Sequence, residues 1–185
     1  IQIASDLHLE FGHNVHIPNA GADVLVLAGD ICIAKSFKNK ERNINNLGYY
    51  TFFDEVCANF KNVIYIMGNH EHYKAKDFAT TPNLIRAALK DLSNVHFLDN
   101  DCVTLDGIKF VGATLWTDCN KGDPITISTL AQGMADYRVI KHGHSIKVKT
   151  MYGDAYYTSK FTPSFTKRPW TYGIPHMHEY IGIKF

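Results

Sequence analysis

Short apolar runs recur along the first hundred residues and indicate the strands of a sheet. Residues 23–28 (DVLVLA) and 62–67 (NVIYIM) are continuous runs rich in β-branched side chains, which is typical of strands covered on both faces. Residues 1–4 are expected to form a third buried strand, and residues 95–98 a short fourth one.

Between these runs the apolar positions recur with helical spacing. A helix is predicted over residues 47–60, with its apolar positions at Leu47, Tyr50, Phe53, Val56 and Phe60. Thr81 and Pro82 suit the cap and the first position of a second helix, whose apolar face comprises Leu84, Ile85, Ala88, Leu89 and Leu92. The polar and basic stretch 35–46 is expected to be a surface loop.

An Asp-Gly pair at residues 106–107 separates two further apolar runs and predicts a hairpin of residues 102–105 with residues 108–116. The order strand, strand, helix, strand, helix, strand, hairpin favours a layered α/β domain. Farther along the chain, residues 125–134 predict a helix and residues 139–149 a pair of strands.

Composition adds only broad bounds. The 185 residues suit a single domain spanning 1–185, and 45% hydrophobic with 20% charged residues is an ordinary globular composition. A net charge of +1 gives no reason to expect a nucleic acid or a membrane as partner, and no apolar run approaches the roughly 18 residues of a membrane span. The four cysteines form no C-x-x-C pair, so reduced thiols and a cytoplasmic location are expected. The sequence opens with a short strand-like segment and reaches a charged motif by Asp6, so no signal peptide is expected.

Side chains suited to binding metal follow three of the predicted strands. The first strand is followed by Asp6-Leu7-His8, the second by Gly29-Asp30 and the third by Gly68-Asn69-His70-Glu71. Because open α/β sheets place their sites at the carboxyl ends of strands, we expect these side chains to converge. The glycines permit sharp turns and leave room beside a ligand.

The types of these side chains favour a divalent metal. Alternation along an extended segment would point Asp6 and His8 the same way, with Leu7 facing the core. The two oxygens of Asp30 can bridge two ions about 3.5–4 Å apart, the geometry used on phosphate esters. Asn69 adds an oxygen ligand without adding charge. Mixed nitrogen and oxygen ligands suit Mn, Fe, Zn or Ni.

The three motifs, in this order, resemble the pattern of the calcineurin-like metallophosphoesterase family: D-x-H, then G-D, then G-N-H-E/D. The resemblance runs from the first residue to about Asp118 and includes the segment GATLW at residues 112–116. It implies the layered α/β sandwich of that family and a phosphate-ester substrate.

By this resemblance, Asp6, His8 and Asp30 hold one metal, and Asp30 and Asn69 hold the other. Asp30 and His70 are the expected catalytic residues, His70 as a general acid or transition-state donor. Glu71 would orient the histidine; a solvated or helix-capping acid is the alternative interpretation of that residue.

The later part of the chain departs from the family pattern. The family completes its site with further histidines, in T-H-H or G-H-x and in G-H-x-H, and these motifs are not evident here. The candidates are His142, His144, His176 and His178, and residues 151–185 form an atypical tail without a clear period. The second half is therefore expected to be truncated, with an incomplete second sheet and one or two bound ions.

The sequence thus predicts a metal-dependent phosphoesterase that hydrolyses a phosphate mono- or diester through a metal-bound hydroxide. Two alternatives remain open at this point. One is a truncated remnant of the family, weakly active or inactive, that serves as a binding module. The other is a nuclease of the same family, for which the even charge gives no support. Neither the oligomeric state nor the substrate is predicted.

Overall fold

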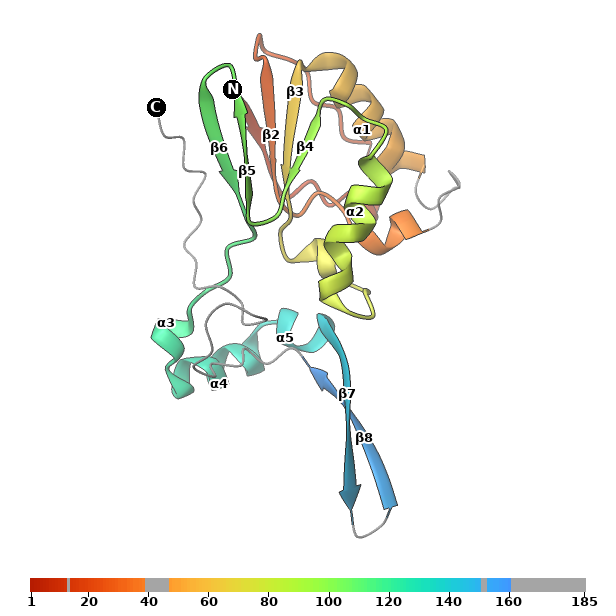
Figure 1. Ribbon diagram of the computed structural model, residues 1–185, viewed down its shortest axis with the longest axis vertical. Coiled ribbons are helices and arrows are strands. Elements are labelled where there is room, and N and C mark those ends of the chain that lie inside the picture. Colours follow the sequence, from red (N-terminus) through yellow and green to blue (C-terminus); the bar gives the residue numbers. More distant parts are fainter. Residues whose placement is uncertain (13, 39–46, 151–152, 161–185) are drawn as a thin grey trace. The chain divides into compact units, whose positions relative to one another are not determined.

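The computed structural model describes residues 1–12, 14–38, 47–150 and 153–160, which divide between two compact units. The first unit holds residues 1–73 and 81–114, and the second holds residues 74–80 and the described residues from 115 onward (Figure 1). No helix among the described residues combines the length and the apolar character that crossing a membrane requires.

A four-stranded parallel sheet forms the centre of the first unit. Its strands are β1 (Gln2–Ala4), β2 (Val24–Ala28), β3 (Asn62–Ile66) and β4 (Val95–Leu98), hydrogen-bonded in that order. The predicted strands are confirmed. All four are parallel, so their carboxyl ends lie at the same end of the sheet, as Figure 1 shows for β2, β3 and β4. Strand β2 is buried almost throughout, as its continuous apolar run predicts.

The expectation that the first strand is buried is wrong. Ile1 is 52% exposed and Ile3 is 55% exposed. Among the described residues, β1 is the edge strand of the sheet and pairs with β2 alone. An apolar run in a short edge strand looks the same in sequence as one in a central strand, because burial depends on which segments cover it.

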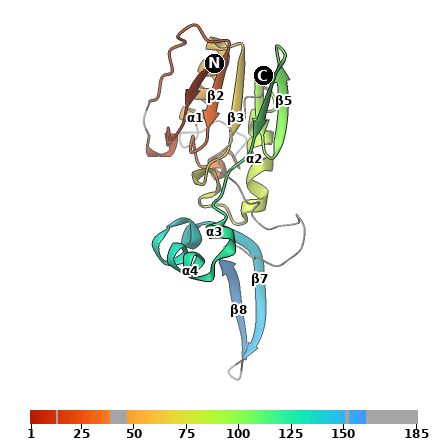
Figure 2. The ribbon, with the colours of Figure 1, turned by 90° about the vertical axis from the view of Figure 1, so that its left-hand side faces the viewer.

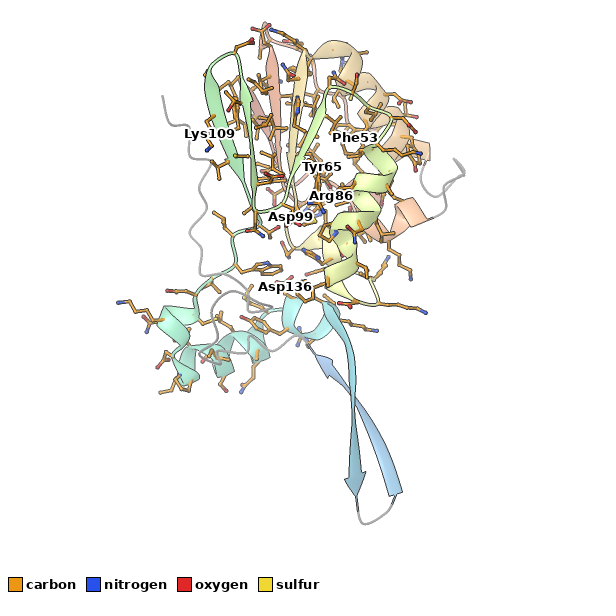
Figure 3. All side chains as sticks on the ribbon, in the orientation of Figure 1. Phe53, Tyr65, Arg86, Asp99, Lys109 and Asp136 are labelled. Carbon is orange, nitrogen blue, oxygen red and sulfur yellow. The ribbon has the colours of Figure 1, made fainter. Side chains whose placement is uncertain are left out.

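Two helices cover one face of the sheet. They are α1 (Leu47–Asn59) and α2 (Thr81–Leu89), close to the predicted bounds. Between them and the sheet lies the larger apolar core, in which Phe53 of α1 and Tyr65 of β3 are fully buried with ring centroids 5.5 Å apart (Figure 3). At the end of this layer Arg86 of α2 pairs with Asp99, 3.6 Å between Nη2 and Oδ2.

The predicted hairpin covers the other face. Its strands are β5 (Asp101–Leu105) and β6 (Ile108–Gly112), and the turn residues Asp106 and Gly107 both have positive φ. They enclose a smaller core with the sheet. Strand β6 ends at Gly112 instead of residue 116, because the chain then leaves the hairpin and the Thr114 hydroxyl donates to the Met67 carbonyl at 2.8 Å. Within the described residues, this second sheet has two strands.

The described connections include short 3-10 helices. In the first unit these are η1 (Leu9–Phe11), η2 (Ala34–Lys38) and η3 (His70–His72), and η4 (Phe78–Thr80) belongs to the second unit. Helix η2 occupies the start of the stretch predicted as a loop, and it buries Phe37 in the larger core. Residues 39–46 of that stretch lie outside the described residues.

The second unit contains α3 (Cys119–Gly122), α4 (Pro124–Gly133), α5 (Asp136–Val139), β7 (Lys141–Thr150) and β8 (Gly153–Lys160) (Figure 2). The predicted helix at 125–134 is confirmed as α4, capped by Asp123, which accepts from the Thr126 nitrogen at 2.7 Å. The predicted strand pair at 139–149 is wrong. That stretch is mostly one strand, β7, and its antiparallel partner β8 comes from residues without a periodic pattern.

Candidate metal centre

The first two motifs are brought together by backbone hydrogen bonds that continue beyond β1 and β2. The Asp6 nitrogen donates to the Gly29 carbonyl at 3.0 Å, and the His8 nitrogen donates to the Asp30 carbonyl at 3.0 Å. The loops after the two strands therefore run side by side, and the carboxylates of Asp6 and Asp30 emerge at the same edge of the sheet.

Asp6, His8 and Asp30 form one candidate ligand group. A ligand atom from each of the three lies within 4.8 Å of the others. All three residues have left-handed backbone conformations, with φ of 55°, 46° and 53°. The expected extended alternation of Asp6 and His8 is therefore wrong, and the left-handed turns aim the side chains instead. Such conformations are costly for non-glycine residues and cluster at functional sites.

The motif glycines allow the loops to approach each other. Gly29 has a φ of 89°, and a Cβ on it would lie 2.8 Å from the Gly68 nitrogen. A Cβ on Gly68 would lie 2.7 Å from the Asp30 nitrogen and would overlap the Asp30 carboxylate. The predicted need for glycine at both positions is confirmed by this close packing of the second and third loops.

The Glu71 carboxylate links the second and third loops by hydrogen bonds. The residue is fully buried, and its carboxylate accepts hydrogen bonds from the nitrogens of Asp30 (3.1 Å), Ile31 (2.8 Å) and Gly68 (2.8 Å) and from the Tyr65 hydroxyl (2.9 Å). Burial is the main cause that raises the pKa of Glu71 to about 7. The interpretation of Glu71 as a solvated acid is thus wrong, and its contacts position the loops rather than the His70 ring.

His70 lies beside the ligand group. Its backbone nitrogen donates to Asp30 Oδ1 at 2.8 Å, and its ring contacts the His8 ring edge-on, with centroids 4.3 Å apart. The Tyr73 ring stacks on the His70 ring, with centroids 4.2 Å apart. The Tyr73 hydroxyl accepts a hydrogen bond from Asn69 Nδ2 at 3.5 Å. Burial raises the pKa of Asp30 above its usual value, and the hydrogen bond from His70 opposes that rise.

Sequence reasoning missed Glu10. Its Oε1 atom lies 3.2 Å from His8 Nδ1 and 2.8 Å from His70 Nδ1, and the side chain is only 8% exposed. His8, Glu10 and His70 form a second group whose ligand atoms lie within 4.8 Å of one another. Its position two residues after His8 could have indicated the first contact. The contact with His70, sixty residues away along the chain, has no local sequence signal.

The donor set fits a divalent metal. Asp6, His8 and Asp30 offer two carboxylates and one imidazole, the mixture that first-row transition ions accept, and His8 and Asp30 are partly buried. The later histidines cannot be compared with this donor set. His142 and His144 belong to β7, where no side chains are described, and His176 and His178 lie outside the described residues.

Comparison with known proteins agrees with this geometry. The family model for calcineurin-like phosphoesterases matches residues 3–181, well beyond the three motifs. The chain is also 28% identical over 94 residues to an uncharacterized protein, L509, of Acanthamoeba polyphaga mimivirus, a stretch that covers 49% of this chain and 32% of that relative. The chain thus matches about a third of the relative's length. With a family match over nearly all of its residues, this chain belongs to the calcineurin-like phosphoesterase family.

Proposed function

We propose that this protein hydrolyses a phosphate mono- or diester with the help of divalent metal ions bound at the carboxyl end of its parallel sheet. The observation that carries this proposal is the convergence of Asp6, His8 and Asp30, three metal-type ligands from two neighbouring strand ends. Membership of the calcineurin-like phosphoesterase family supports the same general chemistry.

Asp6, His8 and Asp30 would hold one ion, and Asp30 and Asn69 would hold a second. A metal at Asn69 would use the amide oxygen, and the bond from Asn69 Nδ2 to Tyr73 suits that orientation. When bound, divalent ions polarise the phosphoryl group and make water a better nucleophile. Mn, Fe, Zn and Ni are all compatible with these ligands.

His70 is suited to serve as the proton donor of the reaction. Its ring lies against His8 and its backbone is fixed to Asp30, so it adjoins the expected metal without being needed as a ligand. Water that has lost one proton to the solvent would attack as hydroxide. As its oxygen bonds to phosphorus and the bond to the leaving oxygen breaks, a proton on His70 would pass to that leaving oxygen. The same N–H could instead stabilise a phosphoryl oxygen in the transition state.

The proposal is tested with chelated protein and two aryl substrates, p-nitrophenyl phosphate and bis(p-nitrophenyl) phosphate. Hydrolysis should be absent after chelation and return with Mn²⁺ or Zn²⁺, and Asp30→Asn should remain inactive. Asp106→Asn makes the same chemical change at an exposed turn residue and should leave the rate unchanged. Parent protein that binds metal but hydrolyses neither substrate would contradict the proposal and favour a binding module.

A further inference from the structure

A single carboxylate oxygen joins the expected metal ligand His8 to the expected proton donor His70. Glu10 Oε1 lies within hydrogen-bonding distance of Nδ1 on both rings, at 3.2 Å and 2.8 Å. The two rings are themselves in edge-on contact. Glu10, His8 and His70 therefore form one connected cluster beside Asp6 and Asp30.

The chemistry of these groups determines which way the hydrogen bonds run. A carboxylate accepts hydrogen bonds and has no proton to donate. Each imidazole must therefore present an N–H at Nδ1, which leaves Nε2 as the nitrogen available for other work. Histidines that bind metals commonly have their second ring nitrogen fixed by a carboxylate in this way.

We propose that Glu10 is a positioning residue that holds His8 and His70 in the Nδ1–H form, so that both Nε2 atoms face the reaction. Nε2 of His8 would then bind the metal. Nε2 of His70 would take up a second proton, which gives the imidazolium form, and would pass that proton to the leaving group. These two roles rest on the proposed function, whereas the form of the imidazoles can be measured without it.

The surroundings of Glu10 favour this role over a purely structural one. Burying a carboxylate is costly unless it is hydrogen-bonded. The other oxygen, Oε2, is buried and has no hydrogen-bond partner among the described residues, so the partners in that part of the chain are the two imidazoles. Glu71, by contrast, accepts mainly backbone N–H groups and secures loops.

The test uses nitrogen-15 NMR of the histidine rings in the metal-free full chain, at about pH 9, where an ordinary imidazole is neutral. In the parent, His8 and His70 should both show a proton on Nδ1. Glu10→Gln should keep this pattern, because the amide oxygen still accepts. Glu10→Ala should move both rings toward the Nε2–H form that free imidazole prefers. Retention of the parent pattern in Glu10→Ala would overturn the proposal.

A second measurement follows Zn²⁺ affinity. Glu10→Ala should weaken binding 10–100-fold, the usual effect of losing the carboxylate that supports a metal-binding histidine. The control is Glu55→Ala, which removes another carboxylate paired with a histidine, His16, and should change neither Zn²⁺ affinity nor the site imidazoles. If Glu10→Ala binds Zn²⁺ with unchanged affinity, the claim that Glu10 positions His8 for metal binding is wrong.

If Glu10→Ala does not fold, Glu10→Asp replaces it. That variant keeps the charge but withdraws the carboxylate by one carbon, so at least one ring should lose its Nδ1–H pattern. Both measurements are made without substrate. If they contradict the role of Glu10, the proposed hydrolysis is not thereby contradicted. Absence of hydrolysis with the imidazole pattern intact would instead count against the proposed function alone.

Discussion

Replacing Glu71 should reveal how much of the fold depends on one buried carboxylate. Its two oxygens accept from three backbone N–H groups and from the Tyr65 hydroxyl. In Glu71→Gln, the amide oxygen can replace Oε2 and keep the bonds from Asp30 and Gly68, while the amide NH₂ donates to a reoriented Tyr65 hydroxyl. The Ile31 N–H alone loses its acceptor, so the free energy of unfolding should fall by about 1–3 kcal/mol.

Glu71→Ala should be far more damaging. It leaves the buried Ile31 N–H and the part-buried N–H groups of Asp30 and Gly68 without an acceptor, at up to about 1–3 kcal/mol each, and it creates a cavity. A loss of about 4 kcal/mol or more is expected, a large part of the roughly 5–15 kcal/mol by which domains are stable.

The assay is urea unfolding of metal-free protein followed by circular dichroism, at about pH 5.5, below the folded-state pKa of Glu71. Asp101→Ala is the control, because Asp101 is exposed and its carboxylate accepts from the neighbouring Cys102 N–H. It should change the stability by less than about 0.5 kcal/mol. If Glu71→Ala unfolds within about 1 kcal/mol of the parent, the role assigned to this carboxylate is wrong.

Three further predictions concern the same site. His70→Ala should lower kcat about 10²–10⁴-fold with metal content nearly unchanged, measured by steady-state kinetics and metal analysis, and loss of metal would show that His70 is a ligand. Gly68→Ala should lower the free energy of unfolding in urea by about 1–3 kcal/mol, because the added Cβ overlaps Asp30. The control Gly48→Ala adds a Cβ in open space on α1 and should leave that free energy unchanged or raise it. Equal stabilities of the two variants would refute the packing argument. Burial raises the pKa of Glu71 from 4.5 to about 7, so the folded protein holds this proton more tightly than the unfolded chain. Its contribution to stability is therefore complete below about pH 4.5 and is lost as the pH rises through about 7, by on the order of 3 kcal/mol, and unfolding of Glu71→Gln should lack this pH dependence.

The sequence was sufficient to place the four strands of the parallel sheet and the candidate ligands that follow them. The runs DVLVLA and NVIYIM are long enough to identify buried strands, and neighbouring parallel strands end at one edge. The convergence of Asp6, His8 and Asp30 follows from that topology and is present in the structure. Their roles as ligands, and those of Asn69 and His70, stay predictions.

What the sequence did not indicate depends on contacts between distant segments. Glu10 meets His70 only because two loops sixty residues apart fold against each other. Glu71 is buried and accepts hydrogen bonds from the N–H groups of Ile31 and Gly68, and no local sequence pattern indicates these contacts. The exposure of Ile3 depends on its place at the sheet edge rather than on its own apolar character.

The central claim is that Asp30 anchors a divalent metal site at the end of the sheet. Equilibrium dialysis of chelated protein against Zn²⁺ and Mn²⁺, followed by metal analysis, tests it most directly. The parent should bind at least one ion per chain, and Asp30→Asn should bind none while keeping its circular dichroism spectrum. A parent that binds no ion, or an Asp30→Asn variant that binds as much as the parent, would contradict the claim.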